Sequence, residues 1–209
     1  MAKVPRTDGP NTARRRQPES RRADLVAAAR ILFFERGVDR TSVEDITRAA
    51  GVAHGTFYLY FDTKDDAVNA VMADVAEGVV ARIAAAAAEQ DTPAVEKLST
   101  VCDALVGLSA PGSSAARDLV AHYHGPEHRD VHDRLAHEVN RQLVPVMAGI
   151  VAQGVAEGAF EATDSTAAAA FALSAIEGLD LLGHRGSEAA AVPTAELTRF
   201  ILRGLGSSL

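Results

Sequence analysis

The sequence has no tryptophan and only one cysteine, Cys102. One cysteine excludes a framework of intramolecular disulfides and is typical of a reducing compartment, so we expect a cytoplasmic protein. Aromatic residues make up only 5% of the chain, although 47% of it is hydrophobic. This composition favours a core of small aliphatic side chains on closely packed helices.

Other absences exclude further classes of protein. No long stretch alternates apolar and polar residues around β-branched side chains, so we expect no sheet. The uncharged runs are too short or too polar to span a bilayer, and the N-terminus has no apolar signal-peptide core. No nucleophile stands in a pattern with a base, and no glycine-rich loop is built to hold phosphates. We therefore expect neither an enzyme nor a cofactor, and no membrane contact.

Charge is distributed unevenly along the chain. Residues 1–60 contain 11 Lys/Arg and 7 Asp/Glu, a balance of +4, whereas the remainder contains 10 and 21, a balance of −11. A basic end on an acidic body is typical of a DNA-binding domain joined to a separate regulatory domain. The alternative is a solvated basic tail on an acidic globule.

The segment 41–61, TSVEDITRAAGVAHGTFYLYF, has the pattern of a helix-turn-helix. Thr41 is placed to cap the first helix, with Glu44 completing a capping box. Gly51 is placed to end that helix, because glycine readily adopts the left-handed backbone conformation. A second helix is predicted from about Ala53 to about 61, and in such motifs this helix enters the major groove of DNA.

The chain around this motif resembles the TetR family of transcriptional repressors. The matching segments are the helix 23–37, then 41–46 (TSVEDI), 50–52 (AGV), 55–58 (GTFY), 60–61 (YF) and Lys64. The resemblance is specific over about residues 20–70 and beyond that rests on the helical layout. Ala53 stands where the family usually has a polar capping residue, and Leu59 is apolar at a position expected to face DNA or solvent.

We predict an all-α fold with an N-terminal three-helix helix-turn-helix domain and a C-terminal helical domain for ligand binding and dimerisation. The expected division is a disordered basic arm over 1–19, a DNA-binding domain over 20–66 and a regulatory domain over 67–209. Nine helices are expected, at about 20–36, 41–50, 53–61, 63–89, 93–108, 115–124, 127–156, 164–182 and 194–205. The fourth has the length to join the two domains as a lever, the role it has in the family.

The candidate partner of the N-terminal domain is double-stranded DNA. Small residues permit close approach to the groove, and hydroxyl, imidazole and ammonium groups bind phosphates or base edges. We assign His54 to a base edge, and Ser42, Tyr58, Tyr60 and Lys64 to phosphates. The full set of candidate DNA-binding residues is Thr41, Ser42, Ala53, His54, Gly55, Thr56, Tyr58, Leu59, Tyr60 and Lys64.

The eighth expected helix is apolar nearly all round, which indicates burial on several sides. With the ninth helix it would form a four-helix bundle between two copies of the chain, so we expect a homodimer through about 164–182 and 194–205. The alternative is a core helix within one subunit.

The resemblance implies a palindromic operator and release from DNA by a small molecule. Few charges fall at inward positions, so we expect an apolar effector of unknown identity. The candidate ligand-binding residues are Cys102, Leu105, Leu119, His122, Tyr123, Met147, Ile150, Phe171, Ser174 and Glu177. Each of them has core packing as its alternative role.

Two other functions stay open. Five histidines lie between 122 and 137, and His128 and His132 are one helical turn apart, a spacing that chelates metals. This cluster favours a metal-sensing regulator or a helical metal-binding protein. No second cysteine or metalloprotease motif supports a metal site, and our site prediction includes no metal.

The second open function is binding of DNA without sequence preference.

Overall fold

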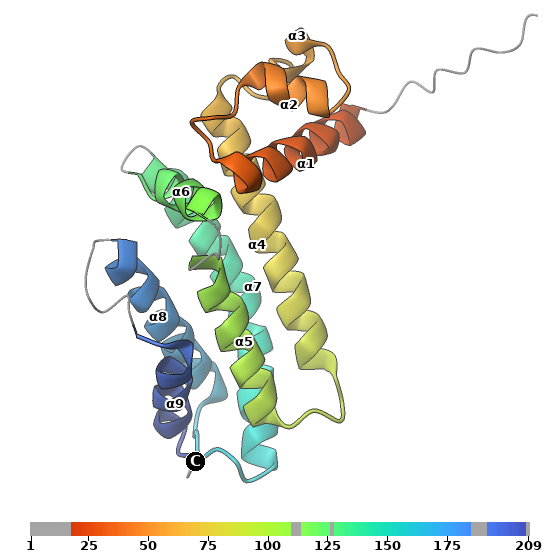
Figure 1. Ribbon diagram of the computed structural model, residues 1–209. Helices are drawn as coiled ribbons and strands as arrows, with labels where there is room; N and C mark the ends of the chain where they lie inside the picture. Colours follow the sequence, from red (N-terminus) through yellow and green to blue (C-terminus); the bar gives the residue numbers. More distant parts are fainter. Residues whose placement is uncertain (1–17, 110–113, 126–127, 185–191, 208–209) are drawn as a thin grey trace, which may run out of the picture.

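The computed structural model describes residues 18–109, 114–125, 128–184 and 192–207. Every regular element in these ranges is a helix, which confirms the predicted all-α fold (Figure 1). The nine helices are α1 (Pro18–Arg36), α2 (Val43–Ala49), α3 (His54–Phe57), α4 (Lys64–Ala88), α5 (Ala94–Ser109), α6 (Ser114–Tyr123), α7 (Arg129–Ala156), α8 (Ser165–His184) and α9 (Thr194–Gly204). Residues 1–17 of the basic arm predicted over 1–19 lie outside the described residues, whereas Pro18 and Glu19 begin α1 and were wrongly placed in the arm. Most of the loops predicted at 110–114 and 183–193 also lie outside the described residues.

Helices α1, α2 and α3 gather at one end of the molecule and share one hydrophobic cluster (Figure 1). Its centre is formed by Leu25 and Phe33 from α1, Ile46 from α2 and Phe57 from α3, all fully buried. Apolar residues at helical spacing on α1 therefore meet the inward residues of both short helices. We call α1–α3 the head of the molecule.

The cap of α2 differs from the predicted one. Ser42, not Thr41, is the N-cap residue, and its hydroxyl accepts a hydrogen bond from the Asp45 backbone N–H. Asp45, not Glu44, completes the capping box by accepting from the Ser42 N–H. The Thr41 hydroxyl instead donates to the Gly37 carbonyl at 2.8 Å. The prediction was one residue early because two hydroxyl residues and two acidic residues stand side by side in the sequence.

Helix α3 is shorter than predicted. It ends at Phe57, and 58–60 form a turn in which the N–H of Leu59 donates to the Thr56 carbonyl. Aromatic residues have weaker helix propensity than alanine or leucine, and two of the three residues after Phe57 are tyrosines. Tyr58, Leu59 and Tyr60 are therefore presented by a turn and not by a helical face.

Helix α4 runs from the head along the rest of the molecule (Figure 1). Its 25 residues correspond to a length of about 38 Å. Val68 and Val71 belong to the hydrophobic cluster of the head, whereas Val79 and Ile83 belong to a second cluster formed with α5, α7, α8 and α9. One rigid helix therefore contributes to both cores.

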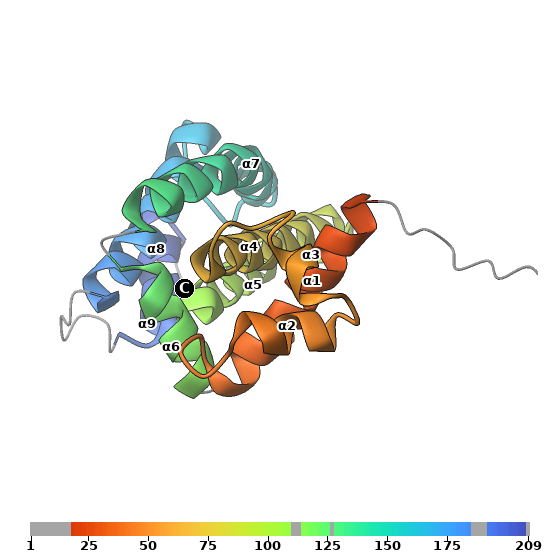
Figure 2. The same cartoon turned by 90° about the horizontal axis from the view of Figure 1, so that it is seen from above.

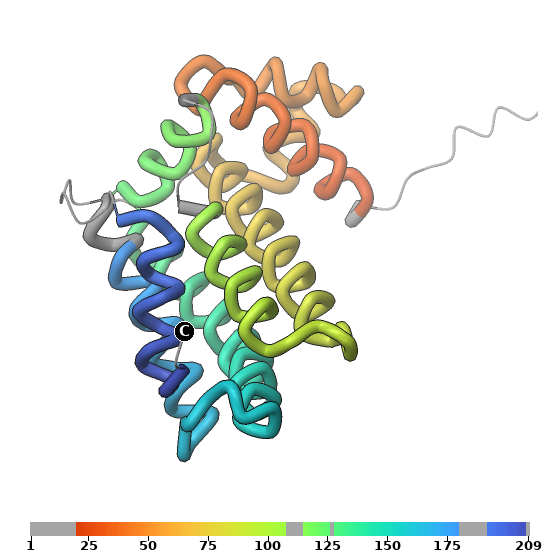
Figure 3. The backbone as a smooth tube through the Cα atoms, turned by 60° about the horizontal axis from the view of Figure 1, so that its bottom comes forward, coloured from red at the N-terminus to blue at the C-terminus, as the bar shows by residue number. Residues whose placement is uncertain are grey.

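The second cluster lies in the part of the molecule that we call the body, helices α5 and α7–α9 with the end of α4. Helices α8 and α9 lie on the side of the body away from α4 (Figure 3). Helix α6 has a different position: seen from above, it lies at the edge of the molecule beside the end of α1 (Figure 2). Leu119 and Tyr123 of α6 belong to the cluster of the head, so α6 is a second link between head and body.

Candidate nucleic-acid interface

The backbone between α2 and α3 exposes the start of α3. Gly51 has a φ of 67° and turns the chain, and Ala53 is the extended N-cap residue with no side-chain hydrogen bond. Ala53, His54 and Gly55 are exposed and Thr56 is half-buried. A Cβ atom added at Gly55 would meet nothing within 4 Å. The start of α3 is therefore exposed, with open space beside Gly55.

Phe57 and Phe61 fix this surface to the core. They are 0% and 4% exposed, and their ring centroids are 5.2 Å apart. Tyr58 and Leu59 lie on the outside, 52% and 77% exposed, and the Tyr58 ring packs edge-on against His54 at 5.6 Å. Exposure of two such side chains costs hydrophobic free energy unless a partner covers them, which is typical of a binding surface.

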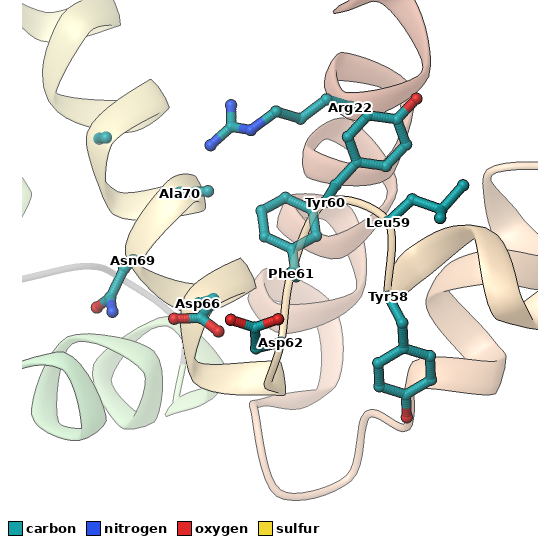
Figure 4. Close-up of a pocket in the computed structure, with 10 residues that line it drawn as sticks. Arg22, Tyr58, Leu59, Tyr60, Phe61, Asp62, Asp66, Asn69 and Ala70 are labelled. Atoms are coloured by element: carbon teal, nitrogen blue, oxygen red, sulfur yellow. The ribbon is translucent and has the colours of Figure 1, made fainter. Parts of the chain in front are cut away.

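Figure 4 shows that the three residues of the turn point in different directions. Tyr58 and Leu59 point outward, whereas the half-buried Tyr60 lies beside Arg22 of α1. All of them line a pocket of about 530 Å³ between α1, the turn and α4. The Arg22 guanidinium lies 5.3 Å from the centre of the Phe61 ring. Arg22 was missed in the sequence, where its only signal was positive charge near the start of the first helix.

Two of the predicted DNA-binding residues, Thr41 and Ser42, have structural partners. The Thr41 side chain is 1% exposed and its hydroxyl is bound to Gly37, so the structure contradicts a DNA contact by that side chain. Ser42 is exposed, but its hydroxyl donates to the Asp45 carboxylate at 2.7 Å. These bonds lower the pKa of Asp45, the Ser42 hydroxyl being the largest cause and the nearby charge of Arg36 a smaller one. In the free protein, Ser42 and Asp45 therefore cap α2.

Lys64 joins α4 to the connection between α1 and α2. Its ammonium donates to the carbonyl oxygens of Val38 at 2.9 Å and Thr41 at 3.3 Å. An ammonium has three N–H donors, so one remains available for a phosphate. Thr63 caps α4 immediately before it, with Asp66 completing the capping box. The start of α4 is thereby held against the motif.

The family model described as "Bacterial regulatory proteins, tetR family" matches residues 25–71, which contain this whole motif. The chain belongs to the TetR family of transcriptional regulators. The resemblance carried by segment 41–61 is therefore confirmed, and the protein is a TetR-family repressor with a DNA-binding helix-turn-helix.

The chain is similar to a curated relative in sequence and to solved structures in fold. The chain is 29% identical over 143 residues to the HTH-type transcriptional repressor KstR2 of Rhodococcus jostii (strain RHA1), covering 67% of this chain and 68% of the relative. Its fold is similar to that of RolR in complex with resorcinol, with 22% identity, coverage of 91% and 90%, and a TM-score of 0.63. It is also similar to FadR of Bacillus subtilis in complex with stearoyl-CoA, with 21% identity, coverage of 90% and 98%, and a TM-score of 0.55.

The predicted ligand-binding residues of this TetR-family regulator do not share one cavity. Cys102, Met147 and Ile150 are buried in the core of the body, and burial raises the pKa of the Cys102 thiol. Leu119 and Tyr123 pack in the head cluster, where burial raises the pKa of Tyr123 to about 12. Periodicity predicted the helix that carries both residues, but it could not show that this helix packs against the head.

Three further residues of that set face outward. Phe171 is 75% exposed and Ser174 is exposed, while Glu177 is an exposed partner of Asn140. They lie on α8, whose apolar composition concealed which side faces the core. Leu105 is half-buried against the body core. The structure therefore contradicts a single interior site made of all ten residues.

Phe171 and Phe200 instead mark an apolar groove between α8 and α9. Phe200 is 69% exposed, and the groove has a volume of about 270 Å³. Its other lining residues are four alanines of α8, Ala162, Thr163 and Asp164 before that helix, and Ile201, Gly204 and Leu205 at the end of α9. The surface is thus apolar, and it lies within the two segments predicted for dimerisation.

The five histidines at 122–137 do not form one cluster. The His132 ring lies 4.5 Å from that of His124, and its Nδ1 is 3.3 Å from Asp133. The His128 ring lies 5.2 Å from that of His122, and His137 is exposed. His128 precedes α7 with a non-helical ψ of 0°, so the spacing of one helical turn between His128 and His132 did not bring those two together.

None of the chain's described helices is long and apolar enough to cross a membrane.

Proposed function

We propose that this TetR-family repressor acts as a homodimer that places one α3 of each subunit in successive major grooves of a palindromic operator. The observation that carries the proposal is the exposed surface of Ala53, His54, Gly55, Tyr58 and Leu59 on a short helix and turn whose Phe57 is fully buried. Recognition helices of this motif read bases with their N-terminal residues.

The residues of the interface have separate roles in this proposal. His54 reads a base edge, and Gly55 and Thr56 permit close approach of the backbone. Tyr58, Lys64 and the half-buried Tyr60 bind phosphates, and Leu59 contacts a thymine methyl group. Ser42 adds a phosphate contact by exchanging its bond to Asp45, and Arg22 adds positive charge beside Tyr60. Phosphate contacts set affinity and register, whereas base contacts set sequence preference.

The dimer is proposed to form through α8 and α9. Phe171 and Phe200 are exposed beside a groove that contains several alanines, and burying them against a second copy would remove apolar surface from water. An isologous contact of two α8–α9 pairs gives a four-helix bundle with twofold symmetry. That symmetry is the reason to expect a palindromic operator.

The chain is proposed to divide into an arm over 1–17, a DNA-binding domain over 18–66 and a regulatory domain over 67–209. An apolar small molecule bound in the body would shift α4, which contributes side chains to both hydrophobic clusters. The two heads would then move apart or together, and the population of the DNA-competent state would fall. The structures of RolR with resorcinol and of FadR with stearoyl-CoA support an organic effector of this kind. To fit in the body, it would push aside core side chains, and the candidates are Cys102, Leu105, Met147 and Ile150.

A spacing experiment tests this function. A DNA site selected by the protein is divided at its centre, and 5 or 10 base pairs are inserted between the halves. A rigid dimer on two half-sites is expected to lose at least tenfold in affinity with 5 base pairs, which turn one half-site to the opposite face of the duplex. Insertion of 5 base pairs without any loss would contradict a dimer on a palindrome, and a protein with equal affinity for random DNA would be a binder without sequence preference.

A further inference from the structure

Three potential metal ligands converge where the head meets the body. One ligand atom from each of Asp65, His122 and His128 lies within 4.8 Å of the other two. Asp65 is in the first turn of α4, His122 is in the last turn of α6 and His128 immediately precedes α7. The closest pair is His122 Nε2 and Asp65 Oδ1, at 3.1 Å. The packing of α6 beside α4 thus joins residues far apart in the sequence.

The setting of these residues differs from that of a solvated surface cluster. His128 is 4% exposed, and Asp65 and His122 are half-buried. Asp66, the other acidic residue of this turn, accepts bonds from the Thr63 N–H and hydroxyl at 2.8 and 2.9 Å, so it is occupied by the cap of α4. Asp65 is therefore the carboxylate of this turn that faces the two imidazoles.

We propose that Asp65, His122 and His128 bind a divalent transition cation, with Zn²⁺ as the best match. Two imidazole nitrogens and a carboxylate oxygen are ligands of zinc, which binds them at about 2.0–2.2 Å and keeps a fourth position for water or another ligand. Mg²⁺ and Ca²⁺ prefer oxygen donors throughout. Ligand atoms around tetrahedral zinc lie about 3.4 Å apart, so small side-chain rotations bring the three atoms to bonding distance. The cation would replace the proton between His122 and Asp65.

A cation at this site would tie the start of α4 to the junction of α6 and α7. Asp65 follows Lys64, whose ammonium holds the connection between α1 and α2. The bound metal would therefore restrain the orientation of the head relative to the body. This consequence, unlike metal binding itself, rests on the proposed function, because orientation matters only if two heads must match an operator.

Zinc binding is tested on the full chain without a polyhistidine tag, by competition with a chromophoric chelator in the absence of DNA. We expect one equivalent per chain with submicromolar affinity, weakened at least tenfold by Asp65→Asn and by His122→Ala. His132→Ala and His137→Ala are matched controls from the same region and should bind zinc as the wild type does. Far-ultraviolet circular dichroism of the metal-free variants verifies that each is folded, and the near-isosteric Asp65→Asn keeps the test valid if a histidine variant unfolds.

Absence of a tightly bound equivalent, or its retention in both Asp65→Asn and His122→Ala, would overturn the site. A second measurement addresses the restraint: zinc should change the affinity of the wild type for its selected DNA site at least threefold and leave that of Asp65→Asn unchanged. Zinc that binds without changing the DNA affinity would overturn the restraint, and failure to prefer any DNA would overturn the proposed function while leaving the zinc result intact.

Discussion

The ammonium of Lys64 lies 2.9 Å from the carbonyl oxygen of Val38, across 26 positions of the sequence. The bond joins the first residue of α4 to the connection after α1, on which α2 and the helix-turn-helix depend. A residue expected from the sequence to bind only phosphate therefore also holds the head together. The proposed phosphate contact and the stability of the head therefore depend on the same side chain.

Replacement of Lys64 by methionine is expected to lower both quantities. Loss of hydrogen bonds from a charged donor to two carbonyls should reduce the free energy of unfolding by about 1–3 kcal/mol. Loss of one phosphate contact should lower the affinity for all DNA sequences and reduce the salt slope by about 1. Urea unfolding and binding at several salt concentrations measure the two effects. An unchanged unfolding free energy would show that the Val38 and Thr41 bonds do not stabilise the head.

Gly55→Ala separates the fold from the interface. A Cβ atom meets nothing within 4 Å in the free protein, and alanine is favoured over glycine in a helix by about 0.5–1 kcal/mol. Stability should therefore be maintained or slightly increased. Affinity for the selected DNA site should fall at least tenfold, because the added methyl group meets the groove.

The matched control for Gly55→Ala is Gly78→Ala on the exposed side of α4, where an added Cβ also meets nothing within 4 Å. That variant should bind DNA as the wild type does. If Gly55→Ala also bound DNA with wild-type affinity, α3 would not approach the groove closely.

Tyr58→Phe and Tyr58→Ala test the phosphate contact of the turn. The side chain is 52% exposed, so loss of the hydroxyl should leave the unfolding free energy within about 0.5 kcal/mol of the wild type. Affinity should fall by similar factors on the selected site and on random DNA, since a phosphate carries no sequence information. Binding titrations on both DNAs measure this. A loss confined to the selected site would make Tyr58 a base-reading residue, the role that we assign to His54.

The capping box of α2 predicts a dependence of stability on pH. The Ser42 hydroxyl is the largest cause of the lowered pKa of Asp45, whose ordinary value is 3.8. A carboxylate with a lowered pKa contributes stability above the pKa of the unfolded chain, and that contribution is lost as the pH falls through the folded value. Urea unfolding between pH 5 and pH 2.5 should show this loss in the wild type and a smaller one in Asp45→Asn. The control is Asp39→Asn, which lies outside the capping box. Equal loss of unfolding free energy at low pH in the wild type and in Asp45→Asn would exclude the capping box as the source of that loss.

Phe171→Glu and Phe200→Glu test the surface of α8 and α9. Both side chains are largely exposed, so the variants should fold, but a charge in an apolar interface is costly to desolvate. Light scattering after size-exclusion chromatography should show a dimer for the wild type and a monomer for the variants. Ile31→Glu, at a 56% exposed residue of α1, is the control and should remain a dimer. Variants that remain dimeric would assign the interface to another surface.

Much of the fold follows from the sequence because apolar spacing and glycine or proline breaks define helices locally. All nine expected helices are present in the described residues, and Gly51 turns the chain as predicted. The errors arose where neighbouring residues offer equivalent chemistry, as with the hydroxyls of Thr41 and Ser42. They also arose on α8, where Phe171 and Leu173 have similar hydropathy but opposite orientation.

Tertiary contacts account for what periodicity could not predict. Lys64 reaches Val38 and Thr41, and α6 places Leu119 in the head cluster, because helices remote in sequence pack together. His122 and His128 meet Asp65 for the same reason, whereas helical spacing favoured His128 with His132. Such juxtapositions depend on the angle between helices, which no local pattern encodes.

The most direct measurement is selection of genomic DNA fragments by the purified protein at physiological salt, followed by sequencing of the bound fragments. Sequence-specific binding by two α3 segments predicts enrichment of one palindromic motif, with half-sites one helical turn apart or a multiple of it. His54→Ala should change the preference at one position of each half-site, by about 1–3 kcal/mol. Recovery of fragments with no shared motif would contradict the account of this surface as a reader of sequence.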